Sequence, residues 1–149
     1  RLQLGSTIPV TVSYENEALE LFADPDQLQQ VASNLIANAL ESSADSREEV
    51  KILIREVKSK EEPGADNAVE IVVSDKGKGM DEDALRRAFD VFFTTKPQGL
   101  GHGLGLPITK EVVRAHNGIV NLESSPEGGT RVTLRIPNQA CDYEGLVIA

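Results

Sequence analysis

The chain has 149 residues, 40% of them apolar, which predicts one domain around a single hydrophobic core. Its formal net charge of −9 argues against nucleic acid as a partner. The single cysteine, Cys141, excludes an internal disulfide and is typical of a reducing compartment. No apolar run reaches the roughly 20 residues of a membrane-spanning helix, so we expect a cytoplasmic domain without direct membrane contact. Arg1 in place of a starting methionine points to a longer parent protein, which can itself be membrane-anchored.

The first third of the chain predicts strands followed by a long helix. Two valines alternate with polar residues in a strand expected over 7–14, and a shorter strand is expected over 19–23. The sequence DPDQ at 24–27 combines an N-cap, a proline at the first helical position and a glutamine three residues after the cap. Apolar residues at helical spacing then predict a helix to about Ser43.

The remaining two thirds predict two hairpins separated by helices. Val- and Ile-rich runs at 51–57 and 69–74 flank a polar loop, and runs at 119–124 and 130–136 flank a Pro-Glu-Gly-Gly turn. Helices are expected over 81–89 and 106–116, the second ending at Asn117 and Gly118.

These elements predict an α+β fold. Runs of strands beside helices indicate a two-layer α/β sandwich, in which helices cover one face of a mixed, mostly antiparallel sheet. We expect residues 1–137 to form this domain and residues 138–149 to form a C-terminal tail.

The long helix carries a polar stripe. Gln30, Asn34 and Asn38 recur every four residues, next to the apolar face, so the asparagines should be partly buried. A buried amide needs a partner, and amide oxygens could complete a Mg²⁺ shell made mostly of water and phosphate oxygens. The alternative is that both amides bond to neighbouring backbone.

The sequence DKGKGM at 75–80 follows a predicted strand. Asp75 could accept a hydrogen bond from an exocyclic amino group, the feature that distinguishes adenine from guanine. Gly77 and Gly79 allow left-handed torsions and a close approach to a ligand. An ordinary acidic turn would have the same composition.

The glycine run GLGHGLG at 99–105 leads directly into a predicted helix. Its unobstructed backbone N–H groups and the helix N-terminus suit a polyphosphate. A flexible linker is the alternative, but Leu104, Leu106 and Ile108 anchor this segment to a core.

Five motifs in this order resemble those of the GHKL superfamily, and within it those of the catalytic ATP-binding domain of two-component sensor histidine kinases. The resemblance covers about residues 7–137, and NALE and FFTTK are similar to the nitrogen-regulation subgroup. The motifs are NLIANALE at 34–41, DKGKG at 75–79, FDVFFTTK at 89–96, GHGLGL at 101–106 and GGT at 128–130.

The resemblance implies the Bergerat fold and ATP and Mg²⁺ as ligands. Asn38 matches the Mg²⁺-ligating asparagine and Asn34 the asparagine that supports it. Asp75 matches the aspartate that reads adenine, in a pocket shaped by Gly77 and Gly79.

Other matching positions lie around the same site. Thr130 matches a residue that contacts adenine through water, and residues 92–101 match the lid over ATP. Lys96 in that lid is either a ligand of the terminal phosphate or a solvated lysine. Glu41 stands where many sensor kinases have a basic residue, and His102 stands where threonine is usual. The phosphate-side residues are Gly101, His102, Gly103, Leu104 and Gly105.

The resemblance also implies the reaction. Relatives that hydrolyse ATP have a glutamate where this chain has Asn34, so water should lack a general base. Neither His102 nor His116 precedes an acidic residue, as a phosphoacceptor histidine would. We therefore expect transfer of the γ-phosphate to a histidine on a separate dimerisation domain of a homodimeric parent, and from there to a response regulator.

Two other interpretations stay open. One is a GHKL protein serine kinase, and the other is a non-catalytic module that senses nucleotide through its interactions.

Overall fold

The structure is a computed structural model, which describes residues 7–17, 19–58, 67–91 and 105–138. None of the helices in these ranges is long and apolar enough to cross a membrane. The elements are β1 (Val10–Tyr14), α1 (Pro25–Ser42), β2 (Val50–Val57), β3 (Ala68–Asp75), α2 (Glu82–Arg87), α3 (Gly105–Ala115), β4 (Ile119–Ser125) and β5 (Gly129–Pro137).

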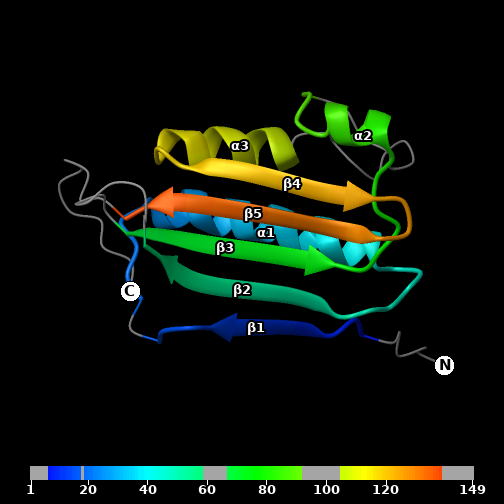
Figure 1. Ribbon diagram of the computed structural model, residues 1–149, viewed down its shortest axis with the longest axis horizontal. Coiled ribbons are helices and arrows are strands. Elements are labelled where there is room, and N and C mark those ends of the chain that lie inside the picture. Colours follow the sequence, from blue (N-terminus) through cyan, green and yellow to red (C-terminus); the bar gives the residue numbers. More distant parts are fainter. Residues whose placement is uncertain (1–6, 18, 59–66, 92–104, 139–149) are drawn as a thin grey trace.

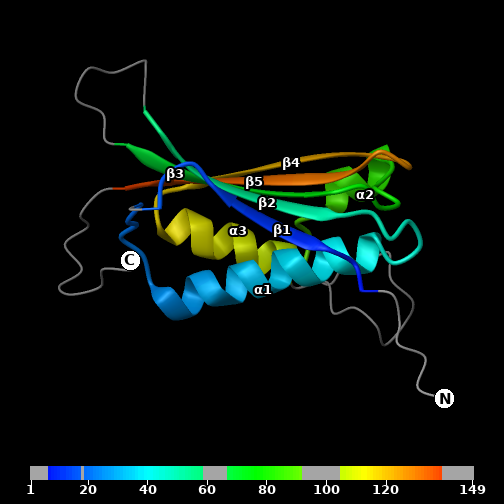
Figure 2. The same cartoon turned by 90° about the horizontal axis from the view of Figure 1, so that it is seen from below.

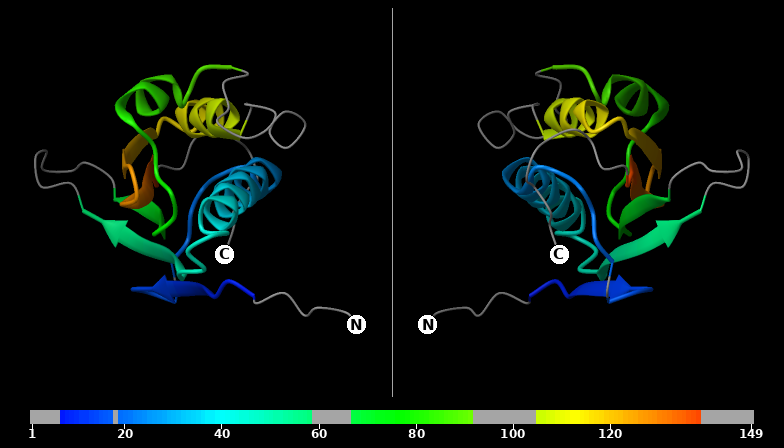
Figure 3. Two further views of the ribbon diagram at one scale, coloured as in Figure 1. Left: turned by 90° about the vertical axis from the view of Figure 1, so that its right-hand side faces the viewer. Right: turned by 90° about the vertical axis from the view of Figure 1, so that its left-hand side faces the viewer.

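The strands form one sheet in the order β1-β2-β3-β5-β4 (Figure 1). β1 runs parallel to β2, and the other neighbours are antiparallel. α1 and α3 lie side by side across one face of this sheet (Figures 2 and 3). The predicted α+β sandwich, with its mixed and mostly antiparallel sheet, is therefore confirmed.

The core lies between the two long helices and the sheet. α1 buries Val31, Leu35 and Ala39 on one stripe, and these pack with Val113 of α3 and Leu134 of β5 in a single cluster. Because this stripe faces the sheet, the polar stripe beside it lies at the boundary between core and solvent.

α1 begins as the sequence predicts. The Asp24 side chain accepts hydrogen bonds from the backbone N–H groups of Asp26 and Gln27, at 2.9 and 3.2 Å. Pro25 occupies the first helical position, where a missing N–H is harmless.

The segment 19–23 is not the strand that we expected, and only Leu21 makes an isolated bridge. Side chains fix this segment instead, since Leu21 and Ala23 are buried in the core. Asn138 also holds it, because its side chain accepts from the Phe22 N–H and donates to the Glu20 carbonyl oxygen. These bonds replace the ladder that a strand would need.

The C-terminal end of α3 matches its prediction. Asn117 has a φ of 59°, the left-handed conformation that often ends helices. The N–H of Gly118 then bonds back to the carbonyl oxygen of Val113 at 2.8 Å. His116 therefore lies at a helix end, as we inferred.

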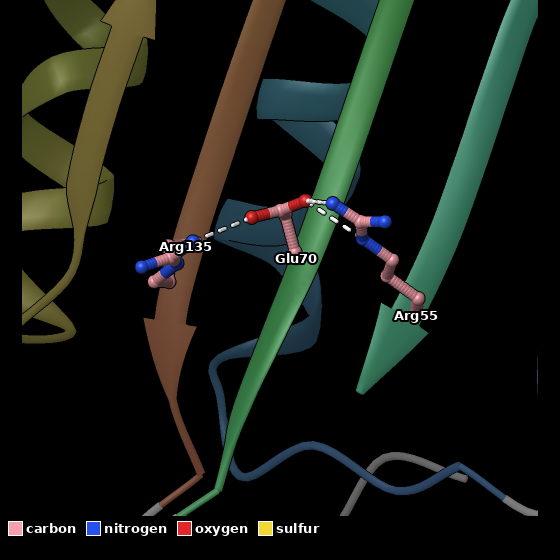
Figure 4. A network of polar contacts seen from close by, with 3 residues as sticks. All are labelled: Arg55, Glu70 and Arg135. Carbon is pink, nitrogen blue, oxygen red and sulfur yellow. Dashed lines mark hydrogen bonds and ion pairs between the residues drawn. The ribbon is translucent and has the colours of Figure 1, made fainter. Parts of the chain in front are cut away.

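Glu70 on the central strand β3 bridges both neighbouring strands, on the face of the sheet opposite α1 (Figure 4). Its side chain accepts from Arg55 Nε of β2 at 2.8 Å and from Arg135 of β5 at 2.9 Å. Burial favours a higher pKa for Glu70, but the hydrogen bonds and charges of Arg135 and Arg55 hold its pKa below the ordinary value. The buried carboxylate therefore stays charged and joins three strands.

Candidate functional site

One end of the candidate site is formed by α1 and the first residue of α3. A methyl group added at Gly105 would lie 3.6 Å from Asn38 Nδ2 and 3.8 Å from Asn34 Cβ. The two asparagines are half-buried, as expected from their stripe. The structure thus brings the N-terminus of α3, where a helix leaves backbone N–H groups without intrahelical partners, against both amides.

Asn34 has an unused hydrogen-bond donor at this place. Its Nδ2 atom is buried and has no hydrogen-bond partner among the described residues. An unpaired buried donor costs about 1–3 kcal/mol, so folded proteins rarely retain one without a reason. An oxygen atom of a bound ligand would supply the missing acceptor.

The other end of the site is the Asp75 carboxyl at the end of β3. Asp75 is buried, and its Oδ1 accepts from the Gly77 N–H at 2.9 Å and from the Ser42 hydroxyl at 3.2 Å. Burial raises the pKa of Asp75 above its ordinary value, although the bonds from Gly77, Ser42 and the Thr130 backbone oppose the rise. A buried carboxyl with this balance is typical of a site that receives a polar ligand.

Two glycines shape the loop after Asp75, each for a different reason. A Cβ at Gly77 would lie 2.2 Å from the Ser42 carbonyl oxygen, so the loop and the end of α1 are in direct backbone contact. Gly79 has a φ of 65°, and a Cβ there would lie 1.9 Å from the Ser125 carbonyl oxygen. Neither position accepts a side chain without movement.

Thr130 lies next to Asp75, as its partner across the β3–β5 ladder. Its hydroxyl shares a hydrogen bond with the Ser124 hydroxyl at 2.9 Å, and Ser124 also donates to the Gly129 carbonyl oxygen. Asp75, Gly77, Gly79 and Thr130 therefore surround one part of the site. Asn34, Asn38 and Gly105 surround another part.

Ser42 joins the two places, and our reading of the sequence missed it. It continues the four-residue spacing of Asn34 and Asn38, one turn further along α1. Because an α-helix rises 1.5 Å per residue, the stripe from Asn34 to Ser42 is about 12 Å long. Extending the spacing by one step would have found it.

Part of the prediction lies outside the described residues, namely the lid and Lys96, Gly101, His102, Gly103 and Leu104. Within the described ranges, no three His, Cys, Asp or Glu side chains gather to hold a metal ion. A metal at this site would therefore rely on amide oxygens and on oxygens of its ligand.

Residues 23–140 match the family described as histidine kinase-, DNA gyrase B- and HSP90-like ATPase. The chain belongs to this family. The match spans most of the chain, and it includes α1, the loop after β3 and the β4–β5 hairpin. The predicted membership of this ATP-binding superfamily is confirmed.

Relatives of this ATPase domain include kinases and sensor proteins. It is 35% identical over 130 residues to sporulation kinase A of Bacillus subtilis, covering 87% of this chain and 20% of that protein. It is 38% identical over 117 residues to the sensor protein FixL of Bradyrhizobium diazoefficiens, covering 78% and 22%. The chain thus spans about a fifth of the length of these relatives.

Solved structures give the same result for the fold of this ATPase domain. It superposes on the catalytic domain of histidine kinase ThkA with a TM-score of 0.67 and 29% identity, covering 87% of this chain and 78% of that one. A mycobacterial sensor histidine kinase, MprB, has the same fold with a TM-score of 0.66 and 24% identity, covering 88% and 82%. The domain is therefore of the histidine kinase catalytic type, and its nitrogen-regulation subgroup stays a prediction.

Proposed function

We propose that this domain binds ATP and Mg²⁺ and donates the γ-phosphate to a histidine on a separate domain of its parent protein. The observation that carries the proposal is the amide nitrogen of Asn34, which is buried beside Gly105 at the start of α3 and has no hydrogen-bond partner in the described part of the chain. A phosphate oxygen is the acceptor that fits both this donor and the helix N-terminus.

Asp75 supports the same ligand at the other end of the site. A buried carboxylate accepts hydrogen bonds, so it selects a base with an exocyclic amino group at that position. We propose that Asp75 binds the adenine amino group, with Gly77 and Gly79 shaping the pocket and Thr130 contacting the base through water. The phosphate end would also include Lys96, Gly101, His102, Gly103, Leu104 and Gly105.

Asn38 is the residue that we propose to hold Mg²⁺, with Asn34 in support. Its amide oxygen is a neutral, hard ligand, which suits a cation whose other ligands are water and phosphate oxygens. The bound cation would neutralise negative charge on the transferred phosphate.

The proposed transfer breaks the bond between the γ-phosphorus and the bridging oxygen, releases ADP and forms a phosphorus–nitrogen bond. The accepting imidazole gives its proton to a base on its own domain. Within this chain, Asn34 stands where hydrolytic relatives have a glutamate, so water would lack a base and hydrolysis would be slow. We further propose a cytoplasmic homodimeric parent and a response regulator as the final acceptor, with residues 1–137 as the ATP-binding domain and 138–149 as a tail.

Calorimetry with a non-hydrolysable ATP analogue and Mg²⁺ tests the binding step. We expect saturable binding by the wild type and at least a ten-fold loss in Asp75→Asn. Asp83→Asn on α2 is the matched control, because Asp83 is exposed and its ion pairs are with Arg86 and Arg87 of the same helix. No binding by the wild type would contradict the proposal.

Phosphotransfer to an added dimerisation domain tests the metal assignment. We expect Asn38→Asp to lose most of this transfer, whereas the exposed control Asn121→Asp on β4 should retain it. Undiminished transfer by Asn38→Asp would contradict the assignment, and transfer to serine instead of histidine would select the serine kinase.

A further inference from the structure

Ser42, the last residue of α1, contacts the loop after β3 through both its side chain and its backbone. Its hydroxyl donates to Asp75 Oδ1 at 3.2 Å. Its carbonyl oxygen accepts from the Lys78 N–H at 3.2 Å. Through these two bonds, Ser42 joins the end of α1 to Asp75 and to the loop that follows it.

Two donors meet at one oxygen of the Asp75 carboxyl. The Gly77 N–H comes from the loop itself, and the Ser42 hydroxyl comes from α1. Without Ser42, the carboxyl would keep only the backbone donors of Gly77 and Thr130, and its χ2 torsion, which is broad for aspartate, would be less restricted. Two donors from different elements give Oδ1 a fixed place, and this fixes the direction of Oδ2.

We infer that Ser42 is a positioning residue for nucleotide recognition: its hydroxyl holds the Asp75 carboxylate in the orientation that accepts a hydrogen bond from the exocyclic amino group of the base. This inference rests on the proposed function, because it concerns how the base is recognised at the same site. It adds a residue from α1, whose other polar positions, Asn34 and Asn38, serve the phosphate end.

The close packing around Ser42 explains why a short hydroxyl is suited to this place. The backbone of Gly77 lies so near the Ser42 carbonyl that even a methyl group would not fit between them. The hydroxyl reaches Asp75 across this contact without moving either backbone. A hydrogen bond to an ionised partner is also more stabilising than a hydrogen bond between neutral groups.

A purely structural role for Ser42 would have a different signature. If the hydroxyl only stabilised the contact between α1 and the loop, its removal would weaken the binding of all purine nucleotides by the same factor. If the hydroxyl orients Asp75, its removal should lower the affinity only for nucleotides that carry the amino group. The distinguishing quantity is therefore a ratio of affinities for two nucleotides that differ only at that group.

Ser43 provides a matched control for the removal of a hydroxyl. It is the next residue, it is fully buried, and its Oγ has no hydrogen-bond partner among the described residues. Ser43→Ala therefore deletes the same atom from the same helix end without touching Asp75.

The experiment measures dissociation constants of the 149-residue chain by calorimetry, for a non-hydrolysable ATP analogue and for its counterpart with hydrogen in place of the 6-amino group. In Ser42→Ala we expect about ten-fold weaker binding of the amino-bearing nucleotide. Binding of its counterpart should change by less than about two-fold, since it makes no bond to Asp75. Ser43→Ala, which keeps the Ser42 hydroxyl, should bind both nucleotides like the wild type.

Unchanged binding in Ser42→Ala, or an equal loss for both nucleotides, would overturn the inference while leaving the proposed function intact. Failure of the wild type to bind either nucleotide would instead overturn both. If Ser42→Ala does not fold, as judged by circular dichroism, Ser42→Cys replaces it, because a thiol is nearly the same shape and a weaker donor. The same selective loss is expected there, and equal affinities would again overturn the inference.

Discussion

The Nε2 atom of His116 accepts a hydrogen bond from the backbone N–H of Asp24 at 3.0 Å. Nδ1 of the same ring therefore carries the proton, and it donates to the Val112 carbonyl oxygen at 2.7 Å. The C-terminal end of α3 is thus joined to the N-cap of α1, 92 residues away. Both helices contribute to the candidate site, so this bond helps to set their relative position.

His116→Ala should lower the free energy of unfolding by about 1–3 kcal/mol, because the partly buried Asp24 N–H loses its acceptor. Urea denaturation followed by circular dichroism measures this change. Arg114→Ala, at an exposed position two residues earlier, should change stability by less than about 0.5 kcal/mol. Equal effects of the two variants would show that the bond between the helix ends adds nothing.

Glu70→Gln should be destabilising at neutral pH by about 1–3 kcal/mol, because two arginines lose a charged acceptor. Their own side chains are 41% and 47% exposed, so water can partly replace the lost bonds. Glu123→Gln on β4 is the exposed control.

The same substitution predicts a pH dependence. The folded-state pKa of Glu70 is lowered, so its contribution to stability is complete above pH 4.5 and is lost as the pH falls through the lowered pKa. The difference between wild type and Glu70→Gln in denaturation experiments should therefore shrink below pH 4.5. A difference that stays constant or grows on acidification would contradict this assignment.

Asp75→Asn should keep or raise the melting temperature of the nucleotide-free domain at pH 7. Burial raises the folded-state pKa of Asp75, so its stabilising contribution is present below pH 3.8 and is lost as the pH rises through the raised pKa. The neutral asparagine removes this cost while its oxygen can still accept from Gly77 and Ser42. A clear fall in melting temperature at pH 7, relative to the control Asp83→Asn, would contradict the prediction.

Gly105→Ala should separate folding from nucleotide binding. The added methyl group meets its nearest atoms, on Asn38 and Asn34, at ordinary contact distances, so thermal stability should be retained. The methyl group nevertheless fills the space beside both amides, and calorimetry should show about ten-fold weaker binding of an ATP analogue. Gly77→Ala is the contrasting variant, since its clash with the Ser42 carbonyl should lower the melting temperature itself.

Local rules predicted most of the fold. The cap at Asp24, the helical spacing in α1 and the Val- and Ile-rich runs of β2 and β3 all agree with the structure, because each depends on neighbouring residues. The prediction of a strand over 19–23 was wrong because this segment depends on a distant residue. Its partner is the side chain of Asn138, which is 116 residues away from Phe22 and leaves no trace in the local pattern.

The types of residue at the site could be predicted from the sequence, but their arrangement in space could not. Residue types and spacing singled out Asn34, Asn38 and Asp75, but the sequence could not show that Asn34 has an unused donor or that Gly105 lies against it. Ser42 was overlooked because a serine at a helix end has an ordinary local role. Its bond to Asp75 depends on how α1 docks on the sheet.

The bridge made by Glu70 also has a consequence for the order of folding. Arg55 is 15 residues from Glu70, whereas Arg135 is 65 residues away. Closing the short loop costs less entropy, so we expect the β2–β3 hairpin to form before β5 joins it. In stopped-flow experiments Arg55→Ala should mainly slow folding and Arg135→Ala should mainly speed unfolding, and the reverse pattern would contradict this order. Two ion pairs on one carboxylate would then report on early and late steps of the same reaction.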